Sequence, residues 1–244
     1  MRDMSARVTL ITGLLGGLLL SFGLLVPQRA IAGVECGGAA ATIVGTSGDD
    51  DLTGTLGRDV IAGLGGEDKL EGRGGDDILC GGADRDRLVG GPGDDTLVGG
   101  GAYDRLLGNR GDDLIRGGSG GGLAVGSGGS DRVVAGSGGH HLEGNKGRDV
   151  IRGGSGHDRL VGGQQDDRIY GGGGPDALCA TRCFPGGTGS DHLSGGGGRD
   201  ELVAQDDPAR GDDTVLGGPD DDRYCADPGD VVRSAETTFD CEFV

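Results

Sequence analysis

The residues best suited to chemistry in this 244-residue chain are aspartates that recur at every ninth position. From Asp50 to Asp113 the interval is unbroken, and beyond Asp113 it is missed only at Gly122 and His140 before residue 179. Evenly spaced carboxylates supply the oxygen ligands that hard cations prefer, and calcium accepts about six to eight of them in flexible geometry. Magnesium demands a tight octahedron, and zinc prefers nitrogen and sulfur. The pattern therefore favours calcium.

A repeating unit of nine residues carries these aspartates. Units such as GGPGDDTLV and GNRGDDLIR follow one another without insertion over residues 45–179. Aspartate is absent from the sixth position only at Gly122 and His140, and Leu, Ile or Val is absent from the eighth only at Ala124 and Tyr224. Biased composition alone does not hold two columns in register over this length. Four further units occupy 186–194, 195–203, 208–216 and 217–225.

Each position of the unit has a physical reason. Glycines at the first, second and fourth positions permit the positive φ angles of a tight turn. The last three residues form a short strand whose middle side chain, the eighth of the unit, faces inward. One unit cannot bury that side chain, whereas a stack of units buries a ladder of them. With two units per coil, the sequence predicts an all-β fold, a parallel β-roll that is a right-handed β-solenoid.

The composition agrees with a repeat array. The chain has 60 glycines, no tryptophan and only 3% aromatic residues, so it lacks the large side chains of a conventional globular core. Collagen is excluded, because glycine does not recur at every third residue. The formal net charge is −18, which repels nucleic acid and anionic membranes and attracts cations. We expect neither nucleic acid nor, once the leader described next is removed, a membrane as partner.

The first 32 residues have the features of a secretory signal peptide. Arg2 and Arg7 precede an apolar run from Val8 to Val26, and Ala30-Ile31-Ala32 forms a small-x-small cleavage site. We therefore predict a secreted, extracellular protein. The alternative is an uncleaved anchor, because the apolar run is nearly long enough to span a bilayer.

The predicted domains follow from the leader and the repeats. A signal peptide over 1–32 and an N-terminal cap segment over 33–44 precede the roll, which occupies 45–225 with insertions near 180–185 and 204–207. A C-terminal cap tail over 226–244 completes the chain.

The units match GGxGxDxUx and resemble the RTX, or haemolysin-type, calcium-binding repeat over about residues 43–225. The resemblance implies that several Ca²⁺ ions bind between successive coils, to sixth-position carboxylates and to carbonyls of the glycine-rich turns. Carried over to this chain, the calcium ligands would be Asp50, Asp59, Asp68, Asp77, Asp86, Asp95, Asp104, Asp113, Asp131, Asp149, Asp158, Asp167, Asp176, Asp191 and Asp200.

The six cysteines all follow the leader, and an even number in an exported chain indicates disulfides. Solenoids need protected ends, so we expect bridges near both termini. The predicted pairs are Cys36 with Cys80, Cys179 with Cys183, and Cys225 with Cys241. A zinc site at Cys179 and Cys183 is the alternative, but no second pair or nearby histidine completes it.

No domain-sized segment lies outside the repeats, and the four histidines (His140, His141, His157 and His192) all fall within repeat units. We therefore expect no enzyme, but a calcium-binding protein with a structural or interaction role. Its expected partners are calcium ions and an extracellular protein or polysaccharide. The alternatives are a secreted polysaccharide-modifying or hydrolytic enzyme and a cell-surface adhesion module.

Alternate units lie on the same side of a roll with two units per coil. The side that begins at Asp59 then carries an aspartate in every turn, whereas the side that begins at Asp50 loses two neighbouring ones, at Gly122 and His140. We predict a continuous calcium column on the first side and an interrupted column on the second. Stacked carboxylates repel one another without metal, so calcium binding and folding should be coupled.

Overall fold

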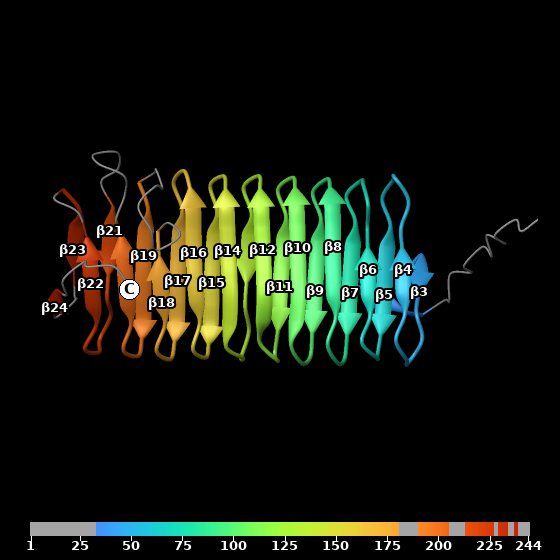
Figure 1. Ribbon diagram of the computed structural model, residues 1–244, viewed down its shortest axis with the longest axis horizontal. Helices are drawn as coiled ribbons and strands as arrows, with labels where there is room; N and C mark the ends of the chain where they lie inside the picture. Colours follow the sequence, from blue (N-terminus) through green and yellow to red (C-terminus); the bar gives the residue numbers. More distant parts are fainter. Residues whose placement is uncertain (1–32, 181–189, 205–212, 227–228, 234–236, 239–244) are drawn as a thin grey trace, which may run out of the picture.

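The computed structural model describes residues 33–180, 190–204, 213–226, 229–233 and 237–238. The predicted signal peptide lies outside these ranges. All regular elements of the described residues are strands, and no helix among them is long and apolar enough to cross a membrane. Figure 1 shows the strands following one another along the long axis of a rod.

Two parallel sheets of eleven strands form the walls of the rod. The odd-strand sheet contains β3 (Ile43–Val44), β5 (Val60–Leu64), β7 (Ile78–Gly82), β9 (Thr96–Gly100), β11 (Leu114–Gly118), β13 (Arg132–Val134), β15 (Val150–Ser155), β17 (Arg168–Gly173), β19 (His192–Gly197), β21 (Thr214–Leu216) and β23 (Val231–Arg233). The even-strand sheet contains β4 (Asp51–Thr53), β6 (Lys69–Glu71), β8 (Arg87–Pro92), β10 (Asp104–Arg110), β12 (Gly122–Gly128), β14 (His140–Lys146), β16 (Arg159–Gln164), β18 (Ala177–Cys179), β20 (Glu201–Ala204), β22 (Arg223–Ala226) and β24 (Thr237–Thr238).

Strands alternate between the two sheets along the chain, so each coil contributes one strand to each wall. Ile61 of β5 pairs with Leu79 of β7, its equivalent one coil later. The same parallel pairing continues to β23 in one sheet and to β24 in the other. The predicted all-β fold, a parallel β-roll with two repeats per coil, is confirmed.

The eighth residue of each unit forms the core, as the strand pattern predicts. Leu70, Leu79 and Leu88 are fully buried, and each stacks on its equivalents in neighbouring coils. Ala124 occupies the same ladder between Leu106 and Leu142. Because most strands contribute one large apolar side chain to the ladder, the interior is narrow, and it also contains buried polar groups.

An N-terminal hairpin of β1 (Glu35–Cys36) and β2 (Ala39–Ala40) precedes the roll. Cys36 and Ala41 pack on Val60 and Ala62, on the outer side of β5. The disulfide between Cys36 and Cys80 ties this segment to β7, which confirms the predicted pair.

Two further cysteines belong to the remaining predicted bridges. Cys179 and Cys225 are each disulfide-bonded. Their predicted partners, Cys183 and Cys241, lie outside the described residues.

Candidate metal centre

The sixth-position aspartates lie inside the roll, where they form ladders parallel to its axis. Asp77 and Asp95 are each 1% exposed, and Asp149 is fully buried. In each ladder the Oδ1 atom accepts a hydrogen bond from the peptide N–H of the aspartate one coil earlier, as from Asp59 to Asp77 at 2.7 Å. The repeat predicts that these carboxylates form a column, but it does not predict that they are buried and bonded to the neighbouring backbone.

The Asp59 ladder is continuous along the rod. Its bonds span 18 residues as far as Asp167, 24 across the insertion near 180–185 and 22 across the insertion near 204–207. Its members are Asp59, Asp77, Asp95, Asp113, Asp131, Asp149, Asp167, Asp191, Asp213 and Asp230.

The Asp50 ladder is interrupted. It runs through Asp50, Asp68, Asp86 and Asp104, and it resumes where the peptide N–H of His140 donates to Asp158, followed by Asp176, Asp200 and Asp222. The predicted continuous column on one side and interrupted column on the other are confirmed for the aspartates themselves. All fifteen predicted ligands therefore lie in one of the two ladders.

Three ladder aspartates were missing from the predicted ligand set. Asp213 and Asp222 hold the sixth position of the last two units, so the repeat itself contained their signal. Asp230 bonds to the N–H of Asp213 across 17 residues. The sequence Gly229-Asp230-Val231-Val232 could have revealed it, because it matches the second half of the repeat unit although it lies outside the nine-residue spacing.

The N-terminal end of each ladder is closed within its own turn. The Oδ2 atom of Asp50 accepts hydrogen bonds from the N–H of Thr46 at 2.6 Å and from its hydroxyl at 3.0 Å. Thr55 makes the same pair of contacts with Asp59, at 2.6 and 2.9 Å. The first carboxylate of each ladder is thus satisfied by a threonine of the same turn.

Farther along the ladders, the second carboxylate oxygen has no such partner. The Oδ2 atoms that are buried without a hydrogen bond belong to Asp68, Asp77, Asp86, Asp95, Asp104, Asp113, Asp131, Asp149, Asp158, Asp167, Asp176 and Asp200. An unsatisfied buried acceptor costs about 1–3 kcal/mol, and an ionised one costs more. A cation beside these oxygens would remove that cost.

In units with a sixth-position aspartate, the first-position glycine lies against the Oδ2 atom of that aspartate. A Cβ atom on Gly45 would lie 2.6 Å from the carbonyl oxygen of Gly63 and 2.7 Å from Oδ2 of Asp50. On Gly54 the corresponding distances are 2.6 Å to the oxygen of Gly72 and 2.8 Å to Oδ2 of Asp59. A carboxylate oxygen and a carbonyl oxygen of the next coil therefore approach the glycine so closely that no side chain fits there. This all-oxygen environment fits calcium.

The turn keeps its shape even where the fourth-position glycine is replaced. Asp84 and Ala102 hold that position with φ of 67° and 55°. The left-handed region costs a non-glycine residue about 1–2 kcal/mol, so the stacked turns impose this conformation on them.

The turns of the Asp59 ladder carry a second row of carboxylates, at the fifth position. The N–H of Asp94 donates to Asp76 at 3.1 Å, and the N–H of Asp112 donates to Asp94 at 2.8 Å. These side chains are exposed, so they add negative charge at the surface of the turns. They were not among the predicted ligands.

Burial raises the pKa of many ladder carboxyl groups when no cation is present. Burial raises the pKa of Asp113 to about 8, while the N–H of Asp95 lowers it and the charge of Asp131 raises it. In the same way burial raises the pKa of Asp167 to about 9, and of Asp86 to about 7. Without a counter-ion, the folded roll therefore favours neutral carboxyls near pH 7 at Asp113 and Asp167.

Among the residues that the structure describes, no three His, Cys, Asp or Glu side chains gather into a metal-binding cluster. A cation between two coils would therefore take a large share of its ligands from peptide carbonyls. The glycine-rich turns supply those carbonyls, and the aspartates supply the negative charge.

No curated protein matches the chain. The family model of the RTX calcium-binding nonapeptide repeat matches residues 37–68, 44–79, 53–88, 89–123, 143–178, 185–207 and 209–231. The stretch 124–142, between two of these segments, contains His140. The matched segments cover well over half of the chain and coincide with the coils that hold the ladders. The chain therefore belongs to the family of RTX calcium-binding nonapeptide repeat proteins.

Proposed function

We propose that this calcium-binding repeat protein acts outside the cell, as a structural or interaction element and not as an enzyme, and that its roll assembles on several calcium ions. The observation that carries the proposal is the row of buried Oδ2 atoms without hydrogen-bond partners, each beside the first-position glycine of its own unit. For several of them, such as Asp68, Asp77 and Asp104, a carbonyl oxygen of the next coil borders the same glycine.

The chain's own groups would bind the ions in a simple way. Within a ladder, Oδ1 of an aspartate such as Asp95 is held by the peptide N–H of the preceding coil, and Oδ2 lies beside the first-position glycine of the same unit. The carbonyl of the next coil supplies a neutral oxygen at the same place. Calcium, when bound, would supply the positive charge that balances the buried carboxylates.

Folding and binding are coupled in this arrangement. Charges about 5 Å apart on neighbouring coils repel by roughly 1–3 kcal/mol at dielectrics between those of water and a protein surface. The unfolded chain has no stacked turns, so calcium binds the folded roll selectively and stabilises it by mass action.

Two features support an extracellular, non-enzymatic role. The Cys36–Cys80 disulfide suits an oxidising compartment. The described residues form the roll and its N-terminal hairpin, whose interior is filled by aliphatic side chains and aspartates. The surface of the rod is then the part left for a partner, for which we propose an extracellular protein or polysaccharide.

Calcium titration of the purified secreted chain tests the proposal. In excess chelator at neutral pH, far-ultraviolet circular dichroism should show a largely disordered chain. Calcium should restore the β signal with a midpoint on the order of 10⁻⁴–10⁻³ M, and magnesium at the same concentration should not. A full β signal in chelator would overturn calcium-dependent assembly.

Fractionation of the producing culture tests the location. Chain recovered from the medium without its first 32 residues would support secretion. Chain retained in the membrane at full length would contradict it and favour the anchored alternative.

A further inference from the structure

The interruption of the Asp50 ladder has its own geometry. Gly122 holds the sixth position of its unit and supplies no carboxylate, so the N–H of Asp104 donates to the carbonyl of Gly121 at 3.4 Å. Gly122 has φ of 140°, and a Cβ atom there would lie 2.9 Å from the nitrogen of Asp104. This coil has no room for an aspartate at Gly122.

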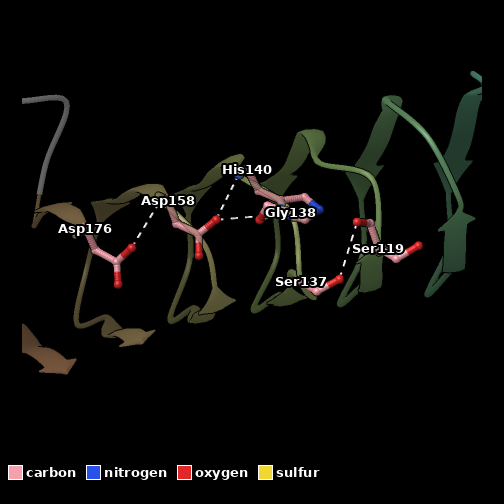
Figure 2. A network of polar contacts seen from close by, with 6 residues as sticks. All are labelled: Ser119, Ser137, Gly138, His140, Asp158 and Asp176. Atoms are coloured by element: carbon pink, nitrogen blue, oxygen red, sulfur yellow. Dashed lines mark hydrogen bonds and ion pairs between the residues drawn. The ribbon is translucent and has the colours of Figure 1, made fainter. Parts of the chain in front are cut away.

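The side chain of His140 fills the place of the missing carboxylate. Its Nε2 atom lies 2.7 Å from the Cβ position of Gly117, the first-position glycine of the Gly122 unit. In the Gly45 unit, Oδ2 of Asp50 holds the equivalent place at the same distance of 2.7 Å. Figure 2 shows the ring extending away from Asp158, toward the coil of Ser119. The imidazole thus reaches back by one coil.

The sequence at Ala135 agrees with this displacement of the His140 ring into the preceding coil. It is the first residue of the His140 unit, a position that is glycine in every other unit over residues 45–179. In the other units that have a sixth-position aspartate, a Cβ atom on the first-position glycine would contact the carboxylate of that aspartate. Because the ring of His140 lies in the preceding coil, the methyl group of Ala135 is accommodated, and Ala135 is packed into the core with 8% exposure.

The hydrogen bonds of His140 fix which ring nitrogen is free to bind. Nδ1 lies 2.7 Å from the carbonyl oxygen of Gly138, which can only accept, so Nδ1 carries the proton. Oδ1 of Asp158 lies 3.6 Å from the same nitrogen. Metal-binding histidines are held in this way, with the second ring N–H donated to a carbonyl or carboxylate. Nε2 then carries a lone pair that can bind a cation. The His140 side chain is 1% solvent-exposed, and Nε2 has no hydrogen-bond partner.

Candidate oxygen ligands lie beside Gly99, the first-position glycine one coil before Gly117. Oδ2 of Asp104 is buried without a hydrogen-bond partner. It borders the Cβ position of Gly99, from which the carbonyl oxygen of Gly117 is 2.5 Å away. Asp104 and His140 are close enough to interact electrostatically.

We infer that Asp104 and His140 form a binding site for one borderline divalent transition-metal ion, such as Zn²⁺, at the interruption of the Asp50 ladder. Calcium takes oxygen ligands, whereas an imidazole nitrogen beside a carboxylate suits zinc, nickel or copper. The donors are one carboxylate oxygen, one imidazole nitrogen and the carbonyl of Gly117, and water completes the coordination. The site differs in kind from the all-oxygen calcium positions and extends beyond the proposed function.

Zinc titration of the calcium-saturated protein by calorimetry tests this inference. The wild-type chain should bind one zinc ion much more tightly than any others, and His140→Ala should weaken that binding at least about tenfold. Asp104→Asn should weaken it as well. The matched control is His192→Ala, because His192 lies in the odd-strand sheet, on the outer face, beside Tyr170. That variant should bind zinc like the wild type.

Two measurements keep the result decisive. Circular dichroism in calcium checks that each variant retains the β signal. X-ray absorption of the zinc-loaded wild-type chain, which needs no variant, should show scattering from one imidazole. Absence of a zinc site, equal binding by His140→Ala, or absence of imidazole scattering would each overturn the inference. If the roll proves to fold without calcium, the proposed function fails, whereas the zinc titration stays a valid test of this site.

Discussion

The Oδ1 atom of Asp167 accepts a hydrogen bond from the peptide N–H of Asp149 at 2.8 Å, across one full coil of 18 residues. The N–H of Asp167 in turn donates to Asp191 at 2.7 Å, across 24 residues. The contact survives a six-residue difference in chain length, so the stacking of coils, and not the local sequence, maintains it. One oxygen of a carboxylate within the ladder is therefore structural, and in members such as Asp149 the other oxygen is available to a cation.

This division of roles predicts opposite effects of one substitution with and without calcium. Asp149→Asn keeps an oxygen for the N–H of Asp131 but removes the negative charge. In calcium, the variant should need a several-fold higher concentration to fold. In chelator, it should be slightly more stable than the wild type, because a buried charge is gone. Circular dichroism during calcium titration measures both effects. Asp112→Asn, at an exposed fifth position, is the control and should change either result little; the same shift in both variants would contradict the prediction.

The metal-free roll should be most stable in acid. Burial raises the pKa of Asp113 to about 8 and of Asp167 to about 9, whereas an unfolded aspartate titrates near about 3.9. The folded state therefore binds more protons than the unfolded state between these values, and stability falls as the pH rises through that window. Calcium-free protein should show β structure at about pH 4 and lose it by about pH 8. A β signal that grows with pH in the absence of calcium would show the opposite sign.

Calcium affinity should depend on pH in the reverse direction. The ion binds ionised carboxylates, so binding releases protons from groups such as Asp86, whose pKa burial raises to about 7. The calcium concentration at the folding midpoint should fall as the pH rises from about 6 to about 8. Titrations at three pH values measure this, and a midpoint independent of pH would count against ladder carboxylates as the ligands.

Two glycines of one unit should differ in their tolerance to alanine. A Cβ atom on Gly72 would meet Oδ2 of Asp77 and lie 2.7 Å from the oxygen of Gly90, whereas on Gly74 it would meet nothing closer than 3.7 Å. Gly72→Ala should cost about 1–3 kcal/mol in calcium or prevent folding, and Gly74→Ala should change stability by less than about 0.5 kcal/mol. Denaturant unfolding in saturating calcium measures both. Similar values for the pair would show that the first-position space is not confined.

The Cys36–Cys80 bridge closes a loop with a sequence separation of 44. On the chain-entropy account such a bridge contributes about 4 kcal/mol, so replacing both cysteines by alanine should lower the stability of the N-terminal coils. Hydrogen exchange in calcium should show the loss of protection concentrated in β3, β5 and β7. Loss spread evenly to β17 would mean that the whole rod unfolds as one unit.

The roll, its register and the difference between its two sides could be predicted because every unit repeats the same two columns. The pattern could not show which way the sixth side chain points, because an aspartate in a turn can equally bond its own backbone, as Asp50 does with Thr46. Nor could it place the ring of His140. Its position depends on the missing carboxylate at Gly122, one coil earlier, and on the hydrogen bond to Gly138 of its own unit. Ala135 was the one available signal, since an alanine in a glycine column implies that the neighbouring carboxylate is gone.

The ladder hydrogen bonds all point in one direction, and this gives the rod a polarity. Each carboxylate bonds the backbone of the coil before it, and the first ones are satisfied by Thr46 and Thr55 of their own turns. Removing coils from the C-terminal end takes acceptors away from the coil that becomes terminal, whereas removing them from the N-terminal end takes away only donors. The two ends of the stack are therefore not equivalent. Units can be duplicated or deleted in pairs within the array, because each pair brings its own donors and acceptors, and the length of such a protein can change without redesign of its ends.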